Sequence, residues 1–176
     1  MISAFILCCV ACFAQQKERR TVEVELGAGI LYSFDKAIFD VTDPGAVLFA
    51  EVKYVFPSMP LDIGAQASCQ IFRRKSELDL MDYTSSNILL IADYSFYQTP
   101  SARAYLGLGA GVGFFEEDRF LERDAPGSFY SRQGAAPFCA MPRIGIQFFR
   151  HLDLSLSYLI EDRANQNLSF RIGYVF

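Results

Sequence analysis

The residues best able to do chemistry in this chain are charged side chains that recur at every second position. Glu23 and Glu25 show this spacing. Side chains two apart on a β-strand share a face, so we expect these charges to line one side of a sheet. Nine of them are predicted to form one network: Glu23, Glu25, Glu51, Lys53, Asp62, Asp93, Arg103, Arg143 and Arg171. Asp153 and Glu161 share the same face.

Two interpretations fit a charged face of this kind when it is enclosed. One is a satisfied ion-pair network, because buried charges are kept only when they are paired. The other is a gated polar plug that admits ions. The neighbours expected from the strand pattern are Arg171 with Glu25, Asp93 with Arg103, and Lys53 with Asp62. We favour the ion-pair network.

Other chemistry finds little support in the sequence. The only histidine, His151, falls in a tight turn, and the carboxylates of 115–137 alternate with arginines, which is typical of a solvated loop. The glycines of 107–113 lack the strand-to-helix context of a phosphate loop. Cys69 and Cys139 fall on opposite faces and have no metal-ligand spacing. We therefore predict no catalytic residues, no metal site and no cofactor, and we expect that the chain is not an enzyme.

Eight segments must position these side chains, and each alternates apolar and mixed residues with a period of two. The segments are 22–34, 46–56, 61–72, 87–97, 103–114, 138–149, 152–161 and 168–176. Strands of about ten residues are what a tilted membrane crossing needs, whereas strands of soluble proteins have about five to six. One face of every segment is apolar, and the other carries most of the charge and glycine.

Three features indicate that the apolar face meets lipid rather than a protein core. Short connections at 57–60, 98–102 and 150–151 alternate with longer polar ones at 35–45, 73–86, 115–137 and 162–167, as in outer-membrane barrels. Aromatic residues gather at both ends of the strands, where a bilayer has its two interfaces. The glycine-rich face of 103–114 suits a narrow lumen. The alternative is a soluble lipocalin-like binder with its faces inverted.

Lipid leaves no partner for an open sheet edge, so the sheet has to close on itself. The sequence therefore predicts an all-β fold, a closed eight-stranded antiparallel up-and-down transmembrane β-barrel. Pro142 lies within a strand and removes one ladder hydrogen bond. We expect either a bulge there or a strand that begins later.

The N-terminus has the character of an export signal. Residues 1–14 hold no charged side chain and end in Cys12-Phe13-Ala14 before Gln15. We predict a signal peptide at 1–14, a short periplasmic segment at 15–20 and a barrel domain at 21–176. In an alternative interpretation, Cys12 is lipid-modified instead of removed. The net charge of -4 argues against a nucleic-acid partner.

The export junction, the eight alternating segments and the terminal Phe176 together resemble the small outer-membrane β-barrel proteins of Gram-negative bacteria, of the eight-stranded type. This resemblance implies an integral protein of the outer membrane, in contact with its lipid. It also implies that Phe170, Tyr174 and Phe176 form a C-terminal signal read by the barrel-assembly machinery. Alternatively, these three residues are only lipid-facing and interfacial.

We expect a structural or surface-interaction role, with a lumen filled by polar and charged side chains. The longest loop, 115–137, carries aromatic residues among its charges, which suits an extracellular protein or a glycan as partner. The second interpretation is a narrow passive channel for ions or small solutes. An outer-membrane enzyme is the third.

Overall fold

The computed structural model describes residues 21–34, 44–75, 79–121, 128–161 and 166–176. The predicted signal peptide at 1–14 and the segment at 15–20 lie outside this part of the chain. Among the described residues, no helix has the length and apolarity that a membrane crossing requires.

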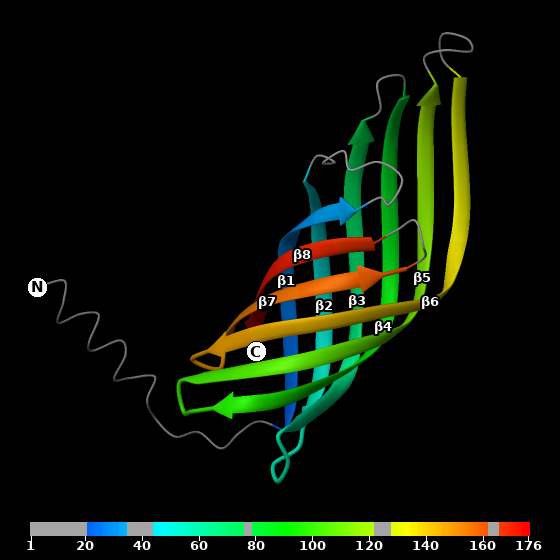
Figure 1. Ribbon diagram of the computed structural model, residues 1–176. Coiled ribbons are helices and arrows are strands. Elements are labelled where there is room, and N and C mark those ends of the chain that lie inside the picture. Colours follow the sequence, from blue (N-terminus) through cyan, green and yellow to red (C-terminus); the bar gives the residue numbers. More distant parts are fainter. Residues whose placement is uncertain (1–20, 35–43, 76–78, 122–127, 162–165) are drawn as a thin grey trace, which may run out of the picture.

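The described residues form eight strands joined in sequence order. They are β1 (Val22–Phe34), β2 (Gly45–Val55), β3 (Leu61–Lys75), β4 (Asp79–Gln98), β5 (Ala102–Leu121), β6 (Ser128–Phe148), β7 (Leu152–Ile160) and β8 (Gln166–Val175). Each strand pairs antiparallel with the next, and β8 pairs with β1 to close the barrel (Figure 1). The predicted fold, a closed eight-stranded antiparallel barrel, is confirmed.

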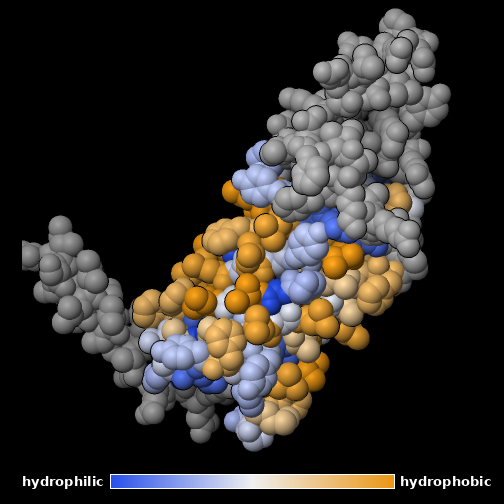
Figure 2. Space-filling view, viewed as in Figure 1, coloured by the Kyte–Doolittle hydropathy of each residue, from blue (hydrophilic) through white to orange (hydrophobic). Residues whose placement is uncertain are grey.

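The two faces of the barrel differ in the way that the alternation predicts. On β2, Leu48 is 63% exposed and its neighbour Phe49 is 6% exposed. The same alternation puts Leu106 and Ile172 outside and Glu25 inside. Figure 2 shows apolar side chains over much of the described outer surface. Because water would penalise such a surface and lipid would not, this exterior suits a bilayer, and the inverted soluble barrel is excluded.

The strands are unequal in length, and this corrects the predicted loops. Strands β3–β6 have 15, 20, 20 and 21 residues, whereas β1, β2, β7 and β8 have 13, 11, 9 and 10. One side of the barrel therefore rises well above the other (Figure 1). The sequence had assigned 73–86 and 115–137 to loops, but most of both ranges is strand. Outside lipid, the outer face need not be apolar, so pairing continues where the hydrophobic alternation stops.

Pro142 lies inside β6 and is exposed on the outer face. The β6–β7 ladder has a gap there, between Ala140, paired with Ile160, and Arg143, paired with Ser157. This gap is on the β7 side only, because Pro142 stays paired with Leu108 of β5. The nearest register shift lies between Gly111 and Gly113 on β5, opposite a different part of β6. The bulge expected at Pro142 is thus absent from these described strands, and β6 begins earlier than predicted, not later.

Candidate functional site

The candidate site is the interior of the barrel. All nine charged residues predicted to share a face point inward, and each is at most 8% exposed. Strand alternation places them there, because their neighbours along each strand face outward. The interior of an eight-stranded barrel is just wide enough for side chains to fill it. Charges on opposite walls can therefore meet across the lumen.

The largest ionic cluster is centred on Arg143 of β6. Its guanidinium donates to both oxygens of Glu51, with Nη1–Oε2 at 2.6 Å and Nη2–Oε1 at 2.8 Å. Its Nε atom donates to Asp93 Oδ1 at 2.8 Å. Lys53 Nζ joins the same carboxylates, 2.9 Å from Glu51 Oε1 and 3.5 Å from Asp93 Oδ2. Glu25 lies at the edge of this cluster, with its Oε2 atom 3.6 Å from Lys53 Nζ.

A second ionic group lies around Arg103 of β5. Its Nη2 atom is 3.2 Å from Glu23 Oε2, and its Nη1 atom donates to Asp62 Oδ2. The described interior thus contains two groups in which an arginine bridges carboxylates from two other strands. Such bridging satisfies the charges that burial would otherwise penalise.

The partners within the network differ from those expected. Arg171 makes no ion pair with Glu25 or with any other residue of the described chain. Its guanidinium carbon lies 3.8 Å from the centre of the Phe49 ring, and its Nη1 atom is 3.6 Å from Met141 Sδ. In register, Arg171 faces Gly29 on β1, while Glu25 faces Val175. Arg171 is therefore paired four residues further along β1 than the predicted contact with Glu25 required.

The two other predicted pairs, Asp93 with Arg103 and Lys53 with Asp62, are also wrong. Asp93 bonds to Arg143 and Lys53, and Asp62 bonds to Arg103. The physical reason is the narrow lumen. The prediction considered only neighbours in the sheet, whereas the contact of Arg143 with Glu51 joins β6 to β2 across the barrel.

Tyr105 and Asp153 extend the Arg143 cluster toward the short turns. The Tyr105 hydroxyl donates to Asp153 Oδ1 at 2.9 Å. Lys53 and Arg143 lie over the Tyr105 ring, 5.4 and 5.6 Å from its centre. The sequence analysis placed Asp153 on the charged face but gave it no partner in the network. The signal available for Tyr105 was its position two residues after Arg103, which puts both side chains on the same face.

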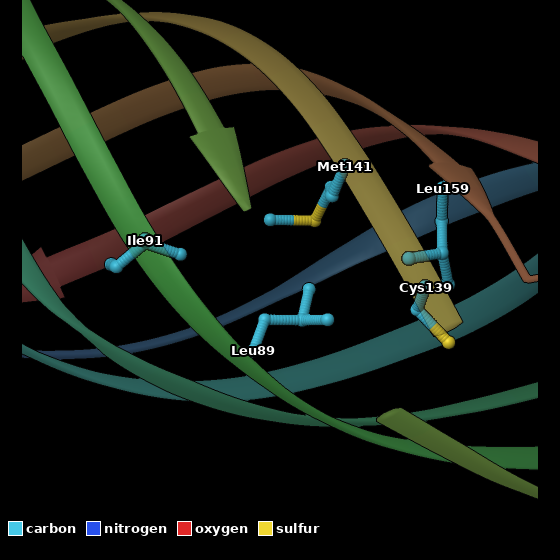
Figure 3. Packing of buried hydrophobic residues seen from close by; sticks show 5 residues of the cluster. All are labelled: Leu89, Ile91, Cys139, Met141 and Leu159. Atoms are coloured by element: carbon cyan, nitrogen blue, oxygen red, sulfur yellow. The ribbon is translucent and has the colours of Figure 1, made fainter. Parts of the chain in front are cut away.

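An apolar layer lies deeper in the lumen, and the sequence interpretation missed it. Leu89 and Ile91 of β4 pack with Cys139 and Met141 of β6 and with Leu159 of β7, all at most 3% exposed. Figure 3 shows these five side chains gathered inside the barrel wall. The run Ile88-Leu89-Leu90-Ile91 is apolar at every position, so alternation could not assign a polar face to it.

A polar group without a cation lies on the loop side of this layer. The Tyr83 hydroxyl donates to Glu161 Oε2 at 3.3 Å, and the Ser85 hydroxyl donates to Glu161 Oε1. Glu161, which follows the last residue of β7, is 4% exposed. Hydrogen bonds from two hydroxyls therefore satisfy a buried carboxyl that has no salt bridge to a cation of the described chain.

Beside Tyr83 the interior is apolar again. Tyr83 packs with Leu31 and Val47, and its ring stacks on Phe115 with 5.8 Å between centres. Phe115, which follows the alternating segment 103–114, thus packs against inward-facing residues. The remainder of the predicted interaction loop, 115–137, is strand from 115 to 121 and from 128 to 137. Its tip, 122–127, lies outside the described residues.

The three residues of the predicted C-terminal signal lie on the outer face of β8 and its end. Phe170, Tyr174 and Phe176 are 57%, 51% and 51% exposed. The Phe176 amide donates to Val24 O at 2.9 Å, which fixes the last residue to β1. His151 Nδ1 donates to Val175 O at 2.8 Å, and its ring stacks on Tyr174. His151 therefore braces the terminal strand at the short-turn rim.

No metal-binding arrangement is found in the part of the chain that the structure describes, where no three or more His, Cys, Asp or Glu side chains are placed to hold an ion. Cys139 is buried inside and Cys69 is partly exposed, both as free thiols. Cys69 pairs with Leu48 in the sheet, on the outward-facing side of β3.

Comparison with known proteins leaves the sequence family open and identifies the fold. No family profile matches the chain, and no curated protein matches it. The chain is similar to the solved structure of Ail, the attachment invasion locus protein of Yersinia pestis, with 19% identity and a TM-score of 0.55 over 88% of this chain and 97% of Ail. Neisserial surface protein A is similar with 13% identity and a TM-score of 0.60, over 89% of this chain and 96% of that one.

Ail has also been solved in complex with the heparin analogue sucrose octasulfate, and that structure is similar with 17% identity and a TM-score of 0.52, over 88% of this chain and 97% of Ail. At these identities the likeness concerns the fold alone. Together with the apolar exterior and the closed sheet, it leads to one conclusion. This chain has the fold of the eight-stranded integral β-barrels of the outer membrane.

Proposed function

We propose that this chain is an integral outer-membrane protein with a structural or surface-interaction role and a filled lumen. The observation that supports this best is that side chains from opposite walls of the described interior meet across the lumen. Arg143 on β6 reaches Glu51 on β2 across the barrel, and the Leu89–Met141–Leu159 layer lies on the loop side of that contact. Side chains that already bond across the barrel leave little room for a hydrated path.

A narrow passive channel is the second candidate, and the buried charges favour it. Lys53 and Arg143 are the kind of side chains that line ion pathways. Against conduction stands the apolar layer, because apolar constrictions exclude water and so block ions. The two candidates differ in one measurable property.

The experiment is single-channel recording on the refolded chain in a planar bilayer. We expect almost no current from the wild-type barrel. Replacing Leu89 and Met141 by serine should open the apolar layer and raise the frequency of current events. Ile88→Ser, on the lipid face of β4, is the matched control and should leave the current unchanged. Steady conductance in the wild-type barrel would favour the channel instead.

The surface-interaction role is supported by the tall side of the barrel. Strands β4–β6 are 7 to 12 residues longer than β1, β2, β7 and β8, a difference of roughly 24–41 Å along the strand at about 3.4 Å per residue. We propose an extracellular protein or a glycan as the partner of residues 115–137. The complex of Ail with a heparin analogue motivates heparin as the first probe. Deleting residues 119–130 should abolish heparin binding measured on nanodisc-embedded barrel, with the barrel still closed. Retained binding in that deletion would exclude this hairpin.

We further propose that Phe170, Tyr174 and Phe176 act as the signal for the barrel-assembly machinery. Their exposed aromatic side chains on the last strand support this role. Phe176→Ala should lower the fraction of chain that reaches the heat-modifiable folded form in cells, while spontaneous refolding in detergent stays near normal. Phe138→Ala, 64% exposed on β6, is the control and should affect neither. Equal loss in cells and in detergent would indicate a purely structural role.

A further inference from the structure

The described interior holds more buried carboxylates than buried cations. Its cations are Lys53, Arg103, Arg143 and Arg171, and its carboxylates are Glu23, Glu25, Glu51, Asp62, Asp93, Asp153 and Glu161. A buried carboxylate is retained in ionised form only with a compensating charge. The excess therefore raises the question of which carboxylates lack a cation of their own.

Most of the cations are already committed. Arg103 bridges Glu23 and Asp62, and Arg143 holds Glu51 and Asp93. Lys53 is closest to Glu51, at 2.9 Å, and lies 3.6 Å from Glu25. Arg171 stacks on Phe49 and forms no ion pair within the described chain. The only ion pair of Glu25 in the described chain is thus the long contact with Lys53, which Glu51 and Asp93 share.

Asp153 lacks even a shared cation. Its Oδ1 atom accepts a hydrogen bond from Tyr105, but its Oδ2 atom has no partner, although the residue is only 1% exposed. No cation of the described chain forms an ion pair with it. A buried charged oxygen without a partner is strongly unfavourable, so something that carries a positive charge is expected beside it.

Glu25 and Asp153 approach each other over Gly173. Asp153 on β7 is the register partner of Gly173 on β8. A Cβ atom at Gly173 would collide with the Glu25 carboxylate, which reaches over from β1. The two carboxylates therefore flank one glycine from opposite sides, and their charges repel each other. The glycine leaves room for the Glu25 carboxylate, which a side chain at this position would displace.

We propose that Glu25 and Asp153 bind one positive charge between them above Gly173, either a proton or a monovalent cation such as Na⁺. The surrounding groups are Lys53 and Glu51 on β2, Asp93 on β4, Tyr105 on β5, Arg143 on β6 and Arg171 on β8. Two carboxylates are too few for a tight divalent site, and a single positive charge suffices for the unpaired oxygen. This site goes beyond the proposed function and is independent of conduction.

The test measures the temperature at which the folded barrel loses its heat-resistant gel mobility, using the full chain refolded in detergent. One series replaces Na⁺ by choline at constant ionic strength, and another raises the pH from about 5 to about 8. If Na⁺ binds, the midpoint falls in choline. If a proton binds, the midpoint is indifferent to Na⁺ and falls as the pH rises. In either case we expect a shift of about 2–4 °C.

Asp153→Asn should remove that dependence, because the remaining Glu25 keeps its contact with Lys53. Glu25→Gln should weaken it, because the bound Na⁺ or proton then contacts the Asp153 carboxylate alone. Glu23→Gln is the matched control. It removes a buried carboxylate that has its own arginine, so it should lower the midpoint and keep the dependence on Na⁺ or pH. Where a variant fails to refold, infrared spectra of the wild-type barrel show directly whether a protonated buried carboxyl is present without Na⁺.

Three results would overturn the proposal. One is a wild-type midpoint that depends on neither Na⁺ nor pH, together with no protonated carboxyl in the infrared spectrum. Another is a dependence that persists unchanged in both Glu25→Gln and Asp153→Asn. The third is a dependence that appears only in Arg171→Met, which would show that Arg171 supplies the charge in the native barrel.

Discussion

At the scale of single residues, the sequence predicts which side chains face the lumen but not which ones meet. The period of two assigns a face to Glu51 and Arg143 independently of any fold detail. Their contact depends on barrel diameter and shear, which no local pattern encodes. Leu89 and Ile91 were missed for a related reason, because a continuous apolar run shows no preferred face.

The contacts of Arg143 predict the largest single-residue effect on stability. Arg143→Met leaves Glu51 and Asp93 buried without the guanidinium that bonds them both, and we expect a loss of about 3–5 kcal/mol. The measurement is the free energy of unfolding in urea from detergent micelles. Arg143→Lys keeps the charge and should lose less. If the two variants lose equally, the hydrogen bonds of the guanidinium matter and its charge does not.

At the scale of elements, the pattern locates strands well inside lipid and poorly outside it. The bounds of β1 are those predicted, and β2 differs by one residue at each end. Strands β4–β6 were truncated in the prediction, because the alternation ends where their outer faces leave the apolar layer. The β4 bulge between Ser95 and Tyr97 was also unforeseen. It turns both Phe96 and Tyr97 outward, 53% and 56% exposed, which adds an aromatic anchor at the short-turn rim.

The β6–β7 turn is the element with measurable backbone strain. Phe149 and Arg150 have φ angles of 50° and 64°, a left-handed conformation that favours Asn and Gly. Replacing the pair by Asn-Gly should stabilise the barrel by about 1 kcal/mol, measured by urea unfolding. The same dipeptide at Pro100–Ser101, where φ is not positive, should give no gain. A loss at the β6–β7 turn would mean that the exposed Phe149 contributes more than the strain costs.

At the scale of the whole molecule, closure and asymmetry coexist. The ring of eight strands satisfies the backbone in lipid, and the closing β1–β8 seam lies among the short strands. The tall side, β3–β6, is stabilised by pairing with its own neighbours up to the described ends. Closure was predictable from strand number and parity. The height of one side was not, because the alternation of apolar and polar residues ends before these strands do.

The two thiols of the barrel domain make the protein its own reporter of opening. Cys69 lies on the outer surface, while Cys139 is 0% exposed and points inward. A maleimide dye in detergent should therefore label Cys69 in the native barrel and reach Cys139 only when a strand detaches. The ratio of the two labelling rates would give the frequency of transient openings without any engineered probe.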